Sequence, residues 1–183
     1  DVSVVRVAAQ PCRTPNRALG LGVVLDEDVV ATAAHTVDDD LRSLTVDGAP
    51  ATVLSIDLRT DLALLAAETA DRAPADLTDP TPGPAATVVS PDGGLDVTIL
   101  STGPLIVHDV TDDVRHERQV HRFMPGVPAG TSGAPLVDEQ QRVLGIVVLD
   151  DRMSDVGYSV TAAEVALVLA APRDLQHPIG CPG

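Results

Sequence analysis

The sequence predicts an all-β fold built from two six-stranded antiparallel β-barrels and a C-terminal helix. Three observations support this prediction. Short β-rich segments alternate with polar or Gly/Pro turns along most of the chain. A proline-rich stretch without a strand pattern divides these segments into two sets, and only one segment has a helical pattern. With 44% hydrophobic residues, the composition is typical of a globular chain.

The first set contains six predicted strands, at residues 3–9, 19–26, 28–33, 42–47, 51–57 and 62–67. The stretch "DRAPADLTDPTPGPA" follows as a linker over residues 71–85. A second set of six or seven strands is predicted at 86–90, 96–102, 104–110, 119–124, 134–138, 143–149 and 156–160. We therefore expect an N-terminal barrel over residues 1–80 and a C-terminal barrel with its helix and tail over residues 81–183.

The helix is predicted over residues 161–171, within "TAAEVALVLAAP". Thr161 followed three residues later by Glu164 forms a capping box, and Pro172 ends the pattern. We expect the helix to dock through an apolar face made of Val165, Leu167, Val168 and Leu169.

The charge of the chain excludes some partners. The formal net charge is −15, the basic residues are all arginine, and Asp38, Asp39 and Asp40 form an acidic run. Nucleic acids and anionic membranes attract basic proteins, so neither is expected to bind here. Basic or neutral substrates are favoured. The acidic run is interpreted as a solvated loop.

No stretch approaches the ~20 apolar residues of a membrane span. The start also lacks the basic and apolar regions of a signal peptide. We expect contact with a membrane only through a segment outside this sequence.

Two cysteines, Cys12 and Cys181, lie near opposite ends of the chain. They could be buried free thiols in a cytosolic protein. They could also form a disulfide, which closes a long loop and requires an oxidising compartment. Neither has a His or Cys neighbour at metal-binding spacing. We expect the disulfide.

Three polar residues stand at turns beside apolar strands. His35 follows the strand in "VVATAAHTV", and Asp61 precedes the strand in "SIDLRTDLALLAAE", where Asp57 is a competitor. Ser132 stands between two glycines in "GTSGAPL". Each residue alone is more typical of a structural role. Together they supply the hydroxyl, imidazole and carboxylate of Ser-His-Asp catalysis, in the order His, Asp, Ser that chymotrypsin-type enzymes use.

These segments resemble the motifs of trypsin-like serine proteases. "ATAAHTV" resembles their "TAAHC" or "TAAHV" motif, "DLALL" resembles the segment at the catalytic aspartate of the bacterial branch, and "GTSGAPL" with "VLGIVV" resembles "GxSGxPL" and the strand after it. The segment "GYSVTAAEV" and the placement of the cysteines are similar to actinobacterial membrane-anchored periplasmic proteases of the acid-resistance type, which have an HtrA-like catalytic domain. The resemblance runs from about residue 20 to residue 160.

The resemblance implies a chymotrypsin-like fold and a role for each motif residue. Ser132 would be the nucleophile, His35 the general base and Asp61 the residue that orients His35. The N–H groups of Gly130 and Ser132 would form the oxyanion hole. The site would lie between the two barrels.

The same resemblance indicates a primary substrate pocket lined by Gly126, Val147, Val148, Asp150 and Gly157. Gly126 stands where trypsin itself has a charged pocket base, so no preference for Arg or Lys is indicated. Thr131 replaces the aspartate that pairs with a newly cut N-terminus in digestive relatives, so activation by that route is not expected.

The other histidines are His108, His116, His121 and His177. We interpret them as solvated loop residues; a metal site from His108, Asp112 and His116 is the alternative. Near carboxylates they could also sense acid pH.

The sequence thus predicts a monomeric, extracytoplasmic serine endopeptidase that acts on proteins or peptides in stress or processing, with no cofactor and no metal. Two alternatives stay open. One is a cytosolic trypsin-like domain cut from a larger protein. The other is a latent or inactive trypsin-like fold that serves as a binding or sensor module.

Overall fold

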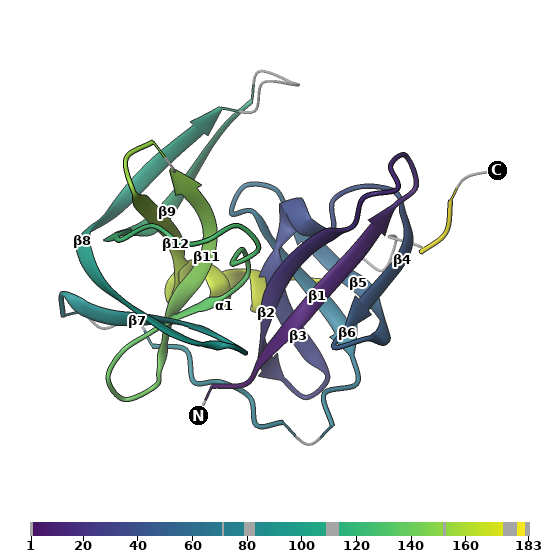
Figure 1. Cartoon of the computed structure of the whole chain (residues 1–183), viewed down its shortest axis with the longest axis horizontal. Coiled ribbons are helices and arrows are strands. Elements are labelled where there is room, and N and C mark those ends of the chain that lie inside the picture. The colour runs from purple at the N-terminus through teal and green to yellow at the C-terminus, as the bar shows by residue number, and fades with distance from the viewer. Residues whose placement is uncertain are drawn as a thin grey trace.

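The structure, a computed structural model, describes residues 2–70, 72–78, 83–108, 114–151, 153–173 and 179–181. Its strands form two closed six-stranded barrels that lie side by side (Figure 1). The predicted all-β fold with two barrels and a C-terminal helix is confirmed.

The first barrel consists of β1 to β6. Neighbouring strands pair antiparallel in the order β1-β2-β3-β6-β5-β4, and β4 closes the barrel onto β1. Alternating Val, Ala and Leu side chains fill its interior, because successive residues of a strand point to opposite faces. The strands are Val4–Pro11, Ala18–Asp26, Val29–Ala33, Leu41–Val46, Ala49–Asp57 and Leu62–Ala67.

The second barrel repeats this plan with β7 to β12. Its strand order is β7-β8-β9-β12-β11-β10, which is the order of the first barrel with six added to each strand number. The two halves of the chain therefore share one topology. The strands are Ala85–Ser90, Gly93–His108, Arg115–Met124, Pro135–Val137, Val143–Asp151 and Val156–Thr161.

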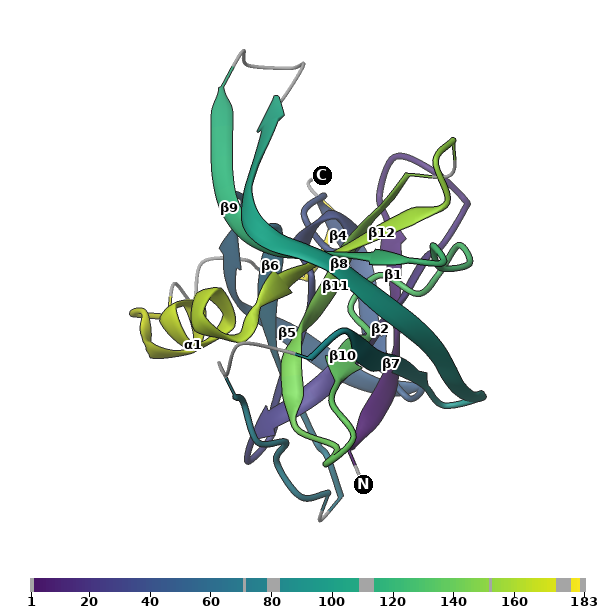
Figure 2. The same cartoon turned by 90° about the vertical axis from the view of Figure 1, so that its left-hand side faces the viewer.

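One predicted strand boundary is wrong. Residues 96–102 and 104–110 were expected to form two strands, but β8 continues through Gly103 and Pro104 to His108. The part of β8 that contains Pro104 pairs with β9 alone, so its other edge is open. Proline is tolerated there because a strand edge needs no N–H donor on its open side. Beyond the barrel, β8 and β9 extend as a projecting hairpin (Figure 2).

The helix α1, Ala162–Ala170, packs against β6, β11 and β12. Thr161 caps it as predicted, since its hydroxyl accepts a hydrogen bond from the Glu164 N–H at 3.5 Å. Val165 and Val168 are buried, but Leu167 is 65% exposed and does not belong to the docking face. No helix in the described part of the chain is both long and apolar enough to cross a membrane.

Glu164 does not complete the capping box. Instead, its carboxylate accepts two hydrogen bonds from the Arg59 guanidinium, at 2.6 and 3.1 Å, and one from the Gln119 N–H at 3.1 Å. Arg59 belongs to the first barrel and Gln119 to β9 of the second. The first turn of α1 therefore holds the two barrels together.

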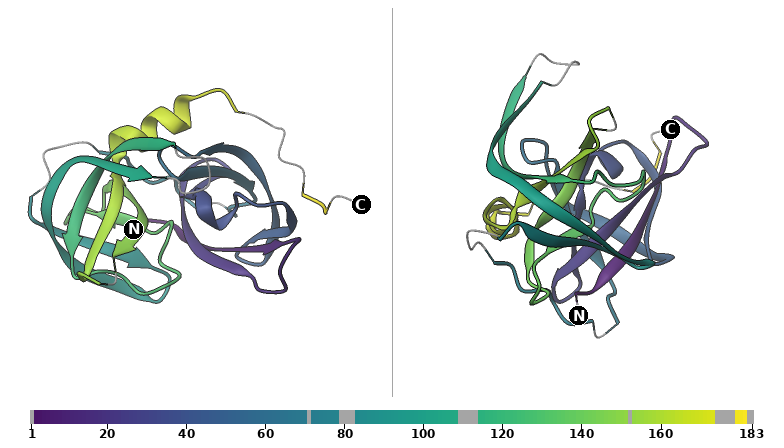
Figure 3. Two further views of the ribbon diagram at one scale, coloured as in Figure 1. Left: turned by 90° about the horizontal axis from the view of Figure 1, so that it is seen from above. Right: turned by 60° about the vertical axis from the view of Figure 1, so that its left-hand side comes forward.

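An apolar cluster continues this interface. The cluster contains side chains of both barrels, among them Val23, Ala31, Leu62, Leu64, Val120, Val137, Ile146, Val148 and Val160. Figure 3 shows the two barrels side by side, with α1 across one side of the junction.

The expected linker lies along both barrels. The Ala75 N–H donates to Val24 in β2 at 2.8 Å, and the Thr78 N–H donates to Val143 in β11 at 2.9 Å. The expected boundary at residue 80 falls within residues 79–82, which lie outside the described residues, so the division into domains stays a prediction.

The C-terminal residues return to the first barrel. Cys12 and Cys181 form the expected disulfide, with their Cα atoms 5.6 Å apart and 169 residues apart in sequence. Ile179 packs against the first core, and the Gly180 N–H donates to Leu41 at 2.8 Å. A loop of this length contributes up to about 5 kcal/mol in the chain-entropy account of disulfides.

The Arg59–Glu164 contact makes stability depend on pH. The hydrogen bond from Arg59 is the main reason that the pKa of Glu164 lies below its ordinary value. A lowered pKa means that the carboxylate stabilises the fold above its unfolded pKa of about 4.3 and that this contribution is lost as pH falls through the folded pKa. We expect Glu164→Gln to lower the free energy of unfolding by about 1–2 kcal/mol at pH 7.

Urea denaturation at a series of pH values measures this effect. The difference between Glu164→Gln and the parent protein should shrink below pH 4. Glu68→Gln, at an exposed carboxylate, is the matched control and should change little. A difference that stayed constant down to pH 3 would mean that the Glu164 charge is not responsible.

Candidate active site

The first part of the site is an Asp–His pair at one end of the first barrel. His35 lies in the short 3-10 turn η1, Ala34–Thr36, directly after β3. One carboxylate oxygen of Asp61 lies 2.8 Å from His35 Nδ1, and the other accepts the backbone N–H of His35 at 2.9 Å. With Nδ1 held by Asp61, the opposite ring nitrogen, Nε2, is the one left to accept a proton.

Asp61 is placed by its own backbone. It has φ = +61°, a left-handed conformation that Asp tolerates better than most residues, and its carbonyl accepts the Ala34 N–H at 2.9 Å. The competitor Asp57 has another role, because its carboxylate accepts the N–H of Arg59 at 2.9 Å within the β5–β6 turn. Of the two aspartates, Asp61 is the one that contacts His35.

The second part is the turn before β10 that carries Ser132. The Thr131 N–H donates to Pro128 at 3.3 Å, and Gly130, between them, has φ = +88°. A bond of this kind with a left-handed third residue is typical of a type II turn, which favours glycine at that position. The Gly133 N–H then donates to Val147 in β11 at 2.7 Å and ties the turn to the second barrel.

This turn leaves two N–H groups available. Within the described part of the chain, the N–H groups of Thr131 and Gly133 have protein acceptors, whereas those of Gly130 and Ser132 have none. The two available donors flank Thr131 and lie at the pocket that Gly130 and Ser132 line. Such a pair can stabilise negative charge on a substrate oxygen.

The serine turn docks on β2 of the first barrel. The Leu21 N–H donates to the Ser132 carbonyl at 2.7 Å. A Cβ on Gly133 would collide with the Leu21 carbonyl, and a Cβ on Gly20 would lie 2.9 Å from the Ser132 carbonyl. Both positions therefore need glycine. This contact brings Ser132, from the second barrel, to the end of the first barrel that carries His35.

A cavity of about 290 Å³ joins the two parts. His35 and Ser132 both line it, although no hydrogen bond joins their side chains among the described contacts. Catalytic hydrogen bonds are often long before substrate binds. The rest of the wall comes from Leu19, Val127, Pro128, Ala129, Gly130, Val147 and Leu149, none of which has a charged side chain.

The predicted substrate-pocket residues are only partly brought together. Val147 lines this cavity. Val148 is 2% exposed and packs in the core between the barrels. Gly126 donates its N–H to Asp155, Gly157 lies against the Phe123 ring, and the side chain of Asp150 lies outside the described part of the structure.

Sequence reasoning missed a charged neighbour of the Asp–His pair. Arg118 extends from β9 of the second barrel, is 7% exposed, and lies 3.8 Å from the Asp61 carboxylate. The same guanidinium nitrogen donates to the Thr60 carbonyl at 3.2 Å. The signal was available in the strand pattern, because Arg118 shares the inward face of β9 with Val120. The predicted strand began at residue 119, after this arginine.

These charges set the protonation of His35. The hydrogen bond to Asp61 is the main reason that the pKa of His35 is raised, and partial burial opposes the rise. The charges of Asp61 and Asp38 raise this pKa further, whereas Arg118 lowers it. Burial lowers the pKa of Arg118, and the negative charge of Asp61 acts against this shift.

The remaining histidines differ from the expectation of solvated loops. His121 is 2% exposed in β9, with its ring nitrogens 2.7 Å from the Thr102 hydroxyl and 3.1 Å from the Leu144 carbonyl. It is a core residue, because β9 is part of the second barrel and the His121 ring reaches across to Leu144 in β11. His116 is half-buried in β9. His177, Asp112 and the side chain of His108 lie outside the described residues, so the alternative metal site stays untested.

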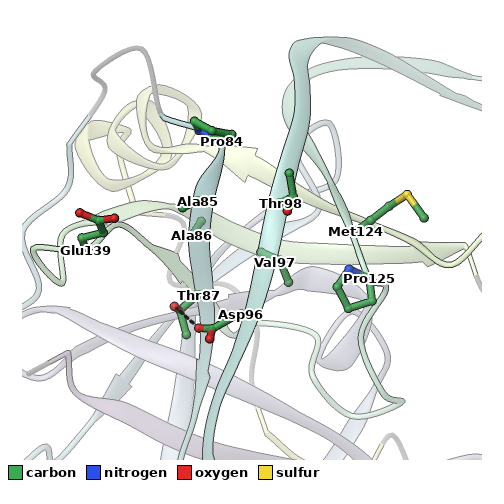
Figure 4. A pocket seen from close by; sticks show the side chains of 10 residues that line it. All are labelled: Pro84, Ala85, Ala86, Thr87, Asp96, Val97, Thr98, Met124, Pro125 and Glu139. Carbon is green, nitrogen blue, oxygen red and sulfur yellow. Dashed lines mark hydrogen bonds between the residues drawn. The ribbon is translucent and has the colours of Figure 1, made fainter.

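A larger cavity, of about 570 Å³, lies away from these residues on the second barrel. It is lined by residues of β7 and β8 and by Pro84, Met124, Pro125 and Glu139. The Thr87 hydroxyl donates a hydrogen bond to Asp96 there (Figure 4). None of the predicted catalytic residues lines it. The smaller cavity is therefore the candidate site.

Comparison with known proteins agrees with this geometry. Residues 20–146 match the trypsin-like peptidase domain family. Serine protease MT3772 and serine protease Rv3671c, from two strains of Mycobacterium tuberculosis, are each 32% identical over 197 residues, which cover 98% of this chain and 48% of the relative. The chain thus spans about half the length of these curated relatives.

Solved structures of serine proteases are also similar to this chain. The active form of Rv3671c protease from M. tuberculosis superposes with a TM-score of 0.85 and 29% identity, covering 97% of this chain and 83% of that chain. Its inactive form gives a TM-score of 0.75 with 29% identity, over 92% and 87%. The HtrA-type protease AlgW, at 16% identity and a TM-score of 0.71 over 91% and 58%, shares the fold. The family match covers more than half of the chain, and the chain therefore belongs to the trypsin-like peptidase family of serine proteases.

Proposed function

We propose that this domain is an active serine endopeptidase with His35, Asp61 and Ser132 as its catalytic triad. The observation that carries the proposal is the meeting of three features at one cavity: an imidazole fixed by Asp61, the Ser132 hydroxyl, and the available N–H groups of Gly130 and Ser132. The higher TM-score against the active form of Rv3671c protease supports an active arrangement.

In this proposal, Ser132 Oγ attacks the carbonyl carbon of the scissile peptide and its proton passes to His35 Nε2. The carbonyl oxygen becomes an oxyanion that accepts hydrogen bonds from Gly130 and Ser132. The C–N bond then breaks as His35 gives the proton to the leaving amine, and an acyl ester remains on Ser132. Water, activated by His35, hydrolyses this ester and restores the serine.

The wall from Val127, Pro128, Ala129, Val147 and Leu149 would receive the side chain before the scissile bond. None of these five residues is charged, so an uncharged side chain suits the wall better than a charged one, which would be buried without a partner. We also propose an extracytoplasmic location, since the Cys12–Cys181 disulfide requires an oxidising compartment.

A latent or inactive binding module is the second candidate. The observation in its favour is that the Ser132 and His35 side chains share a cavity without a hydrogen bond between them. Covalent labelling with a fluorophosphonate separates the two candidates, because only an activated serine reacts at a useful rate.

We expect stoichiometric labelling of the protein and none of Ser132→Ala. His35→Ala should slow labelling by about 1,000-fold or more, since the serine loses its base. Intact-mass spectrometry gives the stoichiometry, and peptide mapping gives the labelled residue. Absence of labelling at pH 8 in a folded protein would support the binding module.

Arg118 gives the proposal a pH signature. The groups that face His35 are Asp61, Asp38 and Arg118, and the base works only when neutral. The pKa of His35 lies above its ordinary value of about 6.5. As the pH is lowered, kcat/KM should therefore begin to fall while the pH is still above 6.5. Arg118→Met removes a positive charge beside the pair, so the pKa of His35 rises further and this fall moves to higher pH.

Arg122→Met, at an exposed arginine of the same strand, should leave the profile in place. An unchanged profile for Arg118→Met would remove Arg118 from the electrostatics of the site.

Gly130 tests the oxyanion hole. Its positive φ is unfavourable for alanine, although nothing lies within 4 Å of the added Cβ. Gly130→Ala should favour a turn with the Ala129–Gly130 peptide reversed, which turns its N–H away and lowers kcat about 100-fold.

The matched control is Gly48→Ala, because Gly48 has φ = +86° and equally open space in the β4–β5 turn. Both variants should lose about 1 kcal/mol of stability from the same backbone strain. Equal kcat in the two variants would contradict the assignment of the Gly130 N–H to the oxyanion hole.

A further inference from the structure

Three arginines line a further cavity, distinct from the candidate site and from the larger cavity on the second barrel. It has a volume of about 510 Å³ and lies at the loop between β1 and β2, beside the start of β4. Its polar lining consists of Gln10, Arg13, Thr14, Arg17, Arg42 and Ser43. Three of the twelve arginines of an acidic chain therefore meet at one hollow.

These three arginines have no partner in the described part of the chain. None of them takes part in a salt bridge or a side-chain hydrogen bond there. By contrast, Arg6, Arg72 and Arg142 each lie 2.6 Å from a carboxylate oxygen. In a chain with a net charge of −15, unpaired guanidinium groups around one hollow form an exception to the general field. Such a group of donors recognises carboxylate or phosphate oxygens.

Strand β2 connects this hollow to the nucleophile. The Leu21 N–H binds the Ser132 carbonyl, Leu19 lines the catalytic cavity beside His35, and Arg17 lines the arginine hollow. Leu21 and Leu19 alternate along β2, and Arg17 directly precedes the first residue of that strand, Ala18. At about 7 Å for every two extended residues, Arg17 lies within about 14 Å of the contact with Ser132 along the chain.

The arrangement of the cavity assigns the hollow to one side of the substrate. The wall from β11 and residues 127–129 receives the acyl half of the peptide, which stays on Ser132. The leaving amine takes its proton from His35, so the leaving half of the substrate passes over His35 and Leu19. Continued in the same direction, an extended peptide reaches the hollow after two to four residues, at about 3.4 Å per residue.

We propose that Arg13, Arg17 and Arg42 form a subsite for an acidic side chain, Asp or Glu, two to four residues after the scissile bond. This inference rests on the proposed endopeptidase function and names a class of substrate for the same site. The arginines bind and orient substrate and take no part in the chemical steps.

Cleavage of a peptide library tests the proposal. A mixture of proteome-derived peptides is digested, and mass spectrometry gives the residues on both sides of each cut. We expect Asp and Glu to be enriched at the second to fourth positions after the cut and not before it. In an Arg13→Gln, Arg17→Gln, Arg42→Gln triple variant this enrichment should disappear.

Two matched peptides then give the magnitude. They share one cleavage site and differ by Glu or Gln at the enriched position. The parent protein should cleave the Glu peptide with a kcat/KM about tenfold higher, because one exposed ion pair accounts for about two- to fivefold and three arginines are present. The preference should weaken between 50 and 500 mM NaCl, since salt screens exposed charges.

Arg173→Gln is the control for net charge. Arg173 is exposed and follows α1, the helix that lies on the opposite side of the molecule from the β1–β2 loop (Figure 2). This variant should keep the preference of the parent protein. If it lost the preference as the triple variant does, general charge would be the cause and the subsite would be refuted.

Two further results separate the possible failures. Normal labelling of Ser132 and normal cleavage without acidic enrichment would refute the subsite and leave the proposed function intact. Where labelling and cleavage are both absent, binding of the Glu and Gln peptides to the Ser132→Ala protein is compared by calorimetry. Equal affinity would refute the subsite independently of activity. Inorganic sulfate that inhibited both peptides equally would indicate a free anion as the ligand and would also refute it.

Discussion

The candidate site depends on one contact between the two barrels. Ser132 comes from the second barrel, whereas His35 and Asp61 come from the first, so no single barrel holds the three residues in register. The contact between Leu21 of β2 and the serine turn fixes their relation, through the 2.7 Å hydrogen bond to the Ser132 carbonyl and the close approach at Gly133. The apolar cluster shared by both barrels supports this contact from behind, because separating the barrels would expose it to water.

Charges at the same interface are paired across it. Asp61 faces His35 within its own barrel and Arg118 from the other, while Glu164 joins Arg59 to β9. A buried charge is costly alone and tolerable beside an opposite charge. At each of these contacts, one side of the interface supplies the arginine and the other supplies the carboxylate. The Nε atom of Arg118 is buried and has no hydrogen-bond partner among the residues that the structure describes. Arg118 is therefore incompletely satisfied as a structural residue, which agrees with an electrostatic role beside Asp61.

The sequence predicted the fold and the three central residues because both leave local patterns. Alternating apolar residues mark strands, and His35, Asp61 and Ser132 each stand at a turn beside one. Features set by the meeting of distant segments were not predictable in this way. Pro104 indicated a break in β8, but the open edge that tolerates it depends on where β7 ends. The alternation in β9 marks Arg118 as a buried position but does not identify Asp61 as its neighbour, and His121 and Arg17 likewise do not indicate which segments lie beside them.

The acidity of the chain and the arginine hollow act at different ranges. A net charge of −15 repels an acidic peptide at a distance, and salt of 0.15 M limits this field to about 8 Å. The three arginines attract a carboxylate only within a few ångströms. Low salt should therefore slow the approach of an acidic substrate and strengthen its final contact, whereas a neutral substrate meets neither effect. The long-range field of the molecule favours a positively charged substrate. A preference of this protein for an acidic substrate residue must consequently arise from the local contact with the three arginines.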